Sequence, residues 1–194
     1  NIAKENTFVH NSDLDFINLN NNQLSHLPAN VFASQNKLAY LGLHYNQFES
    51  FEPNIFAPLE NIKQFALYNN KLTEINSNWF SSSMPDFLYF YAQNNKIEAV
   101  DSRFFFVAPN LQWVLFSNNI CINLYFENFN VNRTANLAKF NKCFDAFYNL
   151  TTTTTSIGTT TTTTFTTPMI TTTSSIESTT TSPTTTTTYT GTTT

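Results

Sequence analysis

One motif returns along most of the chain at a nearly constant interval. Five segments fit the pattern apolar-x-x-apolar-x-apolar-x-x-Asn-x-apolar, and they begin at Leu14, Leu38, Ile62, Phe87 and Leu111. Their asparagines lie at positions 22, 46, 70, 95 and 119, so the spacings are 24, 24, 25 and 24 residues. Five matches at this period predict a stack of similar structural units.

Each place in the motif has a physical role. The apolar residues at the first, fourth and sixth places are expected to point inward from a short strand and the turn before it. An asparagine at the ninth place turns the chain, and its amide can bond the backbone groups that the turn leaves unpaired. We therefore predict a structural asparagine ladder of Asn22, Asn46, Asn70, Asn95 and Asn119.

A second column is aromatic and lies six or seven residues before the next motif begins. It consists of Phe8, Phe32, Phe56, Phe80 and Phe105. An aromatic ring buried in every unit supplies stability that one unit alone lacks. These residues are interpreted as a core Phe spine and not as a cofactor site.

Residues 1–121 resemble leucine-rich repeats of the longer, extracellular type. The resemblance implies an α/β fold: a curved solenoid with a parallel concave sheet and an irregular or 3-10 convex side. Residues 1–8 fit the second half of a repeat. We therefore expect the native protein to extend upstream, with more repeats, a cap and a signal peptide; the alternative is a self-capping start.

Residues 122–150 are predicted to form a C-terminal cap. Leu137, Phe140, Phe144 and Phe147 recur at helical spacing, which predicts a helix near 134–148 that covers the last repeat. A disulfide between Cys121 and Cys143 would close a loop of 22 residues, contributing about 3 kcal/mol. The alternative is two buried free thiols. Extracellular members of the family commonly carry more cysteines in this cap.

Residues 151–194 are mostly Thr, with a few Ser and Pro. This composition predicts a disordered segment, read as an O-glycosylated, mucin-like stalk. The alternative is a solvated linker without sugar. N-glycosylation sequons begin at Asn132 and Asn149. With the stalk and the cysteine pair, they indicate the secretory route and an extracellular location, either secreted or as the ectodomain of a cell-surface protein.

The concave face is the expected binding surface. It is formed by the third, fifth, seventh and eighth places of each repeat, where aromatic residues are dense. Since Tyr and Trp are enriched at binding hot spots, we expect ligand contacts from this group. Its members are Phe16, Tyr40, His44, Tyr45, Tyr68, Tyr89, Tyr91 and Trp113. Lateral packing between strands and a homodimer that covers the face are the other readings.

The sequence disfavours an enzyme, because it holds none of the usual catalytic motifs and no metal-ligand spacing. We therefore expect neither a cofactor nor a metal. The net charge is -4 without a Lys/Arg cluster, which disfavours nucleic acid and an anionic membrane. No segment is apolar and long enough to span a bilayer. The predicted function is recognition of a protein ligand, or of a carbohydrate, by a receptor, adhesion or innate-immune type of module; the alternative is a structural matrix or surface-coat component.

Overall fold

The structure is a computed structural model that describes residues 7–80 and 83–153. The chain divides into two units, Asn1–Ile157 and Gly158–Thr194. The predicted Thr-rich stalk, apart from residues 151–153, lies outside the described residues. All that follows concerns the first unit.

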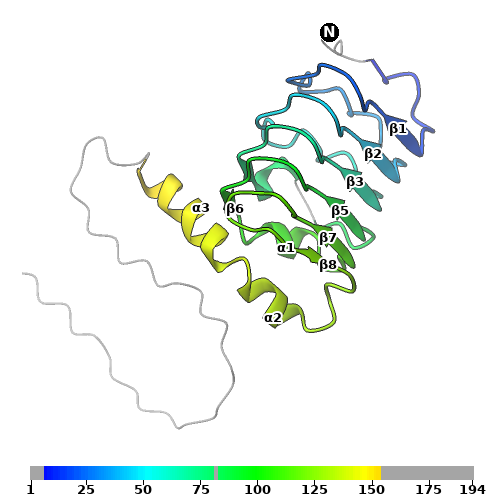
Figure 1. Ribbon diagram of the computed structural model, residues 1–194. Helices are drawn as coiled ribbons and strands as arrows, with labels where there is room; N and C mark the ends of the chain where they lie inside the picture. Colours follow the sequence, from blue (N-terminus) through cyan, green and yellow to red (C-terminus); the bar gives the residue numbers. More distant parts are fainter. Residues whose placement is uncertain (1–6, 81–82, 154–194) are drawn as a thin grey trace, which may run out of the picture. The chain divides into compact units, whose positions relative to one another are not determined.

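Six short strands lie side by side in one sheet (Figure 1). In sheet order they are β1 (Phe16–Asn18), β2 (Tyr40–Gly42), β3 (Gln64–Ala66), β5 (Tyr89–Tyr91), β7 (Trp113–Leu115) and β8 (Tyr125–Phe126). The first five are parallel, and each residue is paired with the residue at the same place of the next repeat, such as Ile17 with Leu41. This register is the one that the spacing of the motif requires.

The core is built from the places of the motif that were predicted to point inward. The middle residue of each strand is buried, and Leu41, Phe65, Phe90 and Val114 have no exposed surface. Because side chains alternate across a strand, the residues on either side of it face outward. The inward residues of all repeats form one continuous hydrophobic cluster.

The opposite side of the core is less regular. It carries a two-stranded parallel sheet of β4 (Glu74–Ile75) and β6 (Ala99–Val100), the 3-10 helix η1 (Ser77–Trp79) and the short helix α1 (Phe104–Val107). The prediction of a solenoid with a parallel concave sheet and an irregular convex side is thus confirmed.

Aromatic rings form a column through the convex half of the core, and its consecutive members are Phe8, Phe32, Phe56, Phe80 and Phe104. Their centroids lie 6.3, 6.0, 5.6 and 6.0 Å apart. The sequence predicted Phe105 as the fifth member of this column, but in the structure Phe104 takes that place. Helix α1 rotates successive side chains by about 100°, so Phe104 faces Phe80 and Phe105 faces the cap, 5.0 Å from Phe140.

The cap contains two helices, α2 (Arg133–Ala138) and α3 (Asn141–Thr153), where the sequence predicted one near 134–148. The break falls at Lys139 and Phe140. The break lets the fully buried Phe140 pack against the last repeat and β8. Its ring centroid lies 5.2 Å from that of Phe116 and 5.7 Å from that of Phe126. Helix α3 also continues to Thr153, past the predicted boundary at residue 150.

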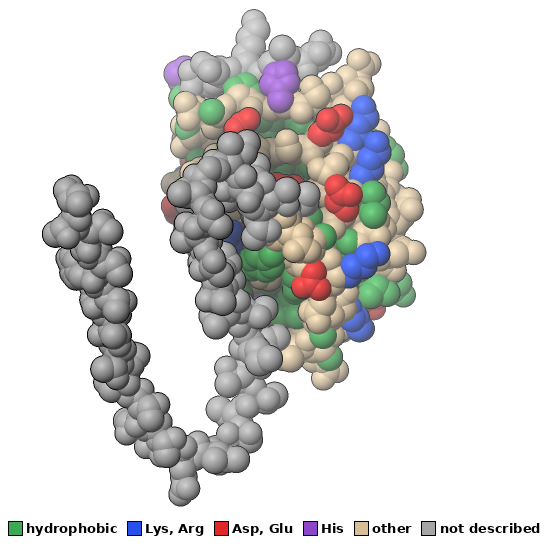
Figure 2. All heavy atoms as spheres, turned by 90° about the vertical axis from the view of Figure 1, so that its left-hand side faces the viewer, with side chains coloured by type: hydrophobic (Ala, Val, Ile, Leu, Met, Phe, Trp, Pro, Cys, Tyr) green, Lys and Arg blue, Asp and Glu red, His purple; other side chains and the backbone are tan. Residues whose placement is uncertain are grey.

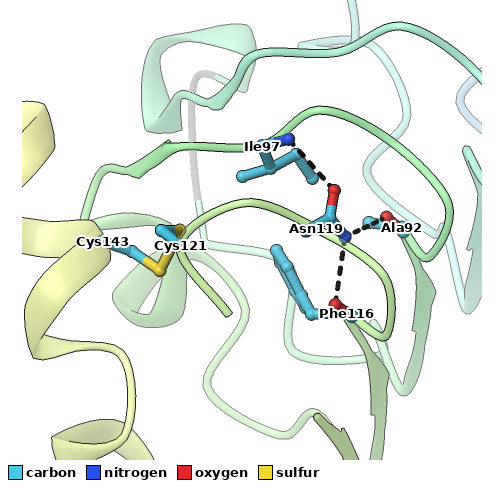
Figure 3. Close-up of a disulfide and its surroundings, with 6 residues drawn as sticks. All are labelled: Ala92, Ile97, Phe116, Asn119, Cys121 and Cys143. Carbon is cyan, nitrogen blue, oxygen red and sulfur yellow. Dashed lines mark hydrogen bonds between the residues drawn. A yellow bond between two sulfur atoms is a disulfide. The ribbon is translucent and has the colours of Figure 1, made fainter. Parts of the chain in front are cut away.

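A disulfide joins Cys121, in the last repeat, to Cys143 on α3 (Figure 3). The two Cα atoms lie 5.2 Å apart, within the usual range for a disulfide. Helix α3 packs beside β6 (Figure 1). The cap is therefore held to the repeats by a covalent bond as well as by aromatic packing.

Candidate ligand-binding surface

The predicted asparagine ladder fixes the spacing between strands. The Oδ1 of Asn119 accepts a hydrogen bond from the backbone N–H of Ile97, and its Nδ2 donates to the carbonyls of Ala92 and Phe116 (Figure 3). Each amide therefore ties its own turn to the backbone of the preceding repeat. The same three bonds occur at Asn46, Asn70 and Asn95.

Asn22 differs from the other members of the ladder. It is exposed, and within residues 7–80 and 83–153 its Nδ2 donates only to carbonyls of its own turn, those of Leu19 and Asn20. The cross-repeat bonds thus begin at Asn46, which is buried.

The third places of the repeats line one edge of the concave face. The rings of Phe16 and Tyr40 stack with their centroids 4.3 Å apart and their planes 8° from parallel. Tyr89 and Trp113 are paired in register on β5 and β7. Phe16 is 55% exposed and Trp113 is 40% exposed, so wide aromatic surfaces face solvent at both ends of this row.

A second aromatic group lies at the seventh and eighth places. His44 stacks on Tyr68 with the ring centroids 4.3 Å apart, and Tyr45 packs edge-on against Tyr68 at 5.4 Å. The sequence predicted that His44 would be an exposed contact, but it is buried, because the Tyr68 ring covers it. Tyr45, at 49% exposed, is the member that a ligand would meet first.

The surroundings of His44, Tyr40, Tyr68 and Tyr91 on this face shift their pKa values toward the neutral forms. Burial lowers the pKa of His44 below its ordinary value. Burial also raises the phenol pKa of Tyr40, with a further contribution from the charges that Tyr68 and Tyr91 would carry if ionised. The phenol pKa values of Tyr68 and Tyr91 are raised first by burial and then by Tyr45 and Tyr89, respectively. At neutral pH the face offers uncharged hydroxyl groups that donate and accept hydrogen bonds.

Charge is distributed unevenly around the repeats. The third, fifth, seventh and eighth places contain no Asp, Glu, Lys or Arg in any of the five repeats. The left-hand side of Figure 1, away from the six-stranded sheet, instead carries interspersed acidic and basic side chains (Figure 2). The concave face is therefore aromatic, polar and free of formal charge.

Two features of the site were missed from sequence. Strand β8 adds Tyr125 to the sheet, 65% exposed and paired with Leu115 of β7 in antiparallel register. Its segment lies beyond the last motif, so no repeat signal marks it. Gly42 also leaves room for the Tyr40 side chain to lie across the strand, a contact that the motif does not indicate.

The predicted glycosylation residues lie at the surface of the cap. Asn132 is exposed, with left-handed backbone, directly before α2. Asn149 is exposed on α3. Among the described residues, no helix is long and apolar enough to cross a membrane. Within the same residues, no group of three or more His, Cys, Asp and Glu side chains is placed to hold a metal ion.

Comparison with solved structures supports the fold. The leucine-rich repeat domain of APL1 is similar with a TM-score of 0.53 and 20% identity, over 58% of this chain and 29% of that one. TLR13 in a complex with ssRNA13 has a TM-score of 0.48 and 24% identity, over 53% and 14% of the two chains. Toll in the Toll–Spatzle complex, from Drosophila, has a TM-score of 0.48 and 26% identity, over 50% and 13%. The chain spans less than a third of each of these proteins. No protein-family model and no curated protein sequence matches it.

Proposed function

We propose that this leucine-rich-repeat solenoid is an extracellular recognition module that binds a ligand, a protein in the first instance, on its concave face. The observation that carries the proposal is the row of third places, in which Phe16 and Trp113 are exposed and Tyr40 and Tyr89 are half-buried. Aromatic side chains provide large contact areas at low entropic cost, and an exposed row of them without a partner favours aggregation.

The extracellular location rests on the cap. A disulfide persists in oxidising compartments, and Cys121 and Cys143 form one. The exposed sequon residues Asn132 and Asn149 are accessible to the glycosylation machinery of the secretory route. We extend the proposal to residues 151–194 as a glycosylated spacer that carries the module away from a surface.

The charge pattern argues for the class of ligand. Nucleic acids are bound through cationic side chains that neutralise phosphates, and none lies at the outward places of the repeats. No catalytic or cofactor role is included in the proposal, because its aromatic groups are suited to contact and not to bond-breaking chemistry.

Capture of partners from an extracellular extract tests the proposal. The full chain and a Tyr89→Ala/Trp113→Ala variant would be compared by affinity purification, with Phe106→Ala as the control. Phe106 is 77% exposed but lies on α1, outside the concave sheet. We expect the double variant to lose the captured partner and the control to retain it. Equal capture by all three proteins would instead favour the structural matrix or surface-coat alternative.

A further inference from the structure

The backbone is unusual at one position of the concave face. Among the described residues, eight non-glycine residues have a positive φ, and seven of them are Asn. The exception is Tyr45, with φ of 54°. It occupies the eighth place of its repeat, where the other repeats have Asn21, Asn69, Asn94 and Asn118 in the same conformation. Asn tolerates left-handed backbone, whereas a bulky side chain is strained there.

Strain of this kind is informative because it is retained only when the side chain provides something in return. Tyr45 does little for the core, since it is 49% exposed. Its ring instead stands at 79° to the ring of Tyr68 and at 64° to the ring of His44. The strained turn therefore places the Tyr45 ring edge-on beside the stacked rings of His44 and Tyr68.

Small residues lie on the strands beside the Tyr45 ring. Gly42 and Ala66 occupy the fifth places of adjacent strands, and both are buried. A Cβ atom at Gly42 would lie 2.8 Å from the Tyr40 hydroxyl oxygen and 2.5 Å from Asn18 Oδ1. Only glycine therefore allows the Tyr40 ring to lean across the strand.

Several polar groups belong to the same part of the concave face. The phenols of Tyr68 and Tyr91 both lie close enough to Tyr40 to raise its pKa. The Nδ1 of His44 and the Oε1 of Gln93 are buried and have no hydrogen-bond partner in the part of the chain that the structure describes. His44 is only 6% exposed, and an unsatisfied buried polar atom of this kind requires an explanation.

We propose that Tyr40, His44, Tyr45, Tyr68 and Tyr91, here named the tyrosine cluster, form a subsite for a neutral sugar, with Tyr45 as the residue that determines specificity. A pyranose ring has an apolar C–H face that packs on an aromatic ring, and its hydroxyl groups bond phenols, imidazole and amides. It carries no charge, which matches the charge-free face. The inference rests on the proposed function in using the same face, and it specifies the chemistry recognised there.

The test measures binding of neutral oligosaccharides by isothermal titration calorimetry. The probes are homo-oligomers of glucose, mannose, galactose and N-acetylglucosamine, with a sulfated oligosaccharide as the charged control. The full chain is expected to bind at least one neutral probe saturably and to bind the sulfated probe no better. Tyr45→Asn should weaken that binding about tenfold or more.

Tyr45→Asn also separates binding from folding. Because Asn fits the left-handed backbone, this variant should melt about 2–4 °C higher than the original while binding less. The matched control is Asn118→Tyr, which places Tyr in the same backbone conformation three repeats away from Tyr45. It should melt lower and leave sugar binding unchanged.

Several results would overturn the sugar subsite. These are a lack of binding to every neutral probe, binding that survives Tyr45→Asn, or a dimer in light scattering that Tyr45→Asn dissolves. Capture of a protein partner that depends on Tyr89 and Trp113, without sugar binding, would refute the subsite and leave the proposed function intact. Loss of both would refute the two proposals together.

Discussion

The two faces of each strand differ in burial and in the residue types they carry, although their residues alternate along the same three positions. On β5 the inward Phe90 is fully buried between the rings of neighbouring repeats, whereas the adjacent Tyr89 and Tyr91 are half-buried on the concave face. Inward places are apolar in every repeat, while the fifth place alone ranges from Gly42 to Tyr91. The comparison teaches that packing between repeats constrains the residues of one face and leaves those of the other free to vary.

The sharpest test of this division uses neighbouring residues. Phe90→Ala should lower the free energy of unfolding by about 3–5 kcal/mol, because it opens a cavity among rings that cannot close over it. Tyr89→Ala should lower it by about 1 kcal/mol or less, since its side chain keeps access to water. Urea unfolding of both variants measures the difference. Equal losses would show that the outward face is part of the folding core.

The disulfide links the inward-facing residues of the repeats to the cap, because Cys121 occupies the last apolar place of the fifth motif and Cys143 lies on α3. Replacing Cys121 and Cys143 together by Ser should cost about 3 kcal/mol through the freed 22-residue loop. Thermal unfolding of the variant, and of the original chain with a reductant, should agree. A reductant without effect on the melting temperature would show that the cap does not unfold together with the repeats.

The ladder offers a comparison within one type of side chain. Asn70→Ala removes bonds to Phe48 N–H and to the carbonyls of Leu43 and Leu67, so it should cost about 2–3 kcal/mol. Asn22→Ala removes only local, solvent-exposed bonds and should cost about 1 kcal/mol or less. Urea denaturation again provides the measurement. Similar costs would mean that the bonds between repeats contribute little.

The smallest expected effect is on how the free energy of unfolding depends on pH. The concave and convex sides should contribute to it in different pH ranges. The pKa of His44 is below its ordinary value of 6.5, so the unfolded chain binds the proton more tightly and stability falls as the pH drops below that value. His44→Gln should flatten the unfolding free energy between about pH 7 and about pH 5. An unchanged slope in that range would assign the dependence to other groups.

Asp101, on the convex side, titrates in a different window. Burial opposes its ionisation, but hydrogen bonds from Arg103 and Ser77 outweigh burial and bring its pKa below the ordinary 3.8. Its contribution to stability is present above that value and is lost as the pH falls through the lowered pKa. Asp101→Asn should therefore reduce the loss of stability only in strong acid, where circular dichroism would detect it.

The structure of the repeats could be predicted from the sequence because each repeat has the same pattern of apolar residues and asparagine. The spacing of the asparagines predicts the strand register, and the buried middle residues follow from alternation. Phe104 and Phe105 show the limit. The spacing could not determine which of two consecutive phenylalanines faces Phe80, because that depends on whether the segment coils into α1.

The concave face and the cap were harder to predict for the same reason. A position in the motif says that His44 points outward, but only the neighbouring repeat shows that Tyr68 covers it. The helical spacing of Leu137 to Phe147 could not reveal the break before Asn141, which the packing of Phe140 requires. Each miss concerns contact between units, whereas the motif describes one unit at a time.

The amides that bridge neighbouring turns have a consequence for how such a protein can change in length. From Asn46 onward, each amide of the ladder bonds a carbonyl and an N–H of the turn before it, and these turns present the same groups in the same place. If residues 47–70 were excised, Asn95 would meet the carbonyl of Leu43 in place of that of Leu67. Gain or loss of a whole unit leaves the joint chemically unchanged, so an ancestral gene could grow or shrink in steps of one unit while every intermediate still folded.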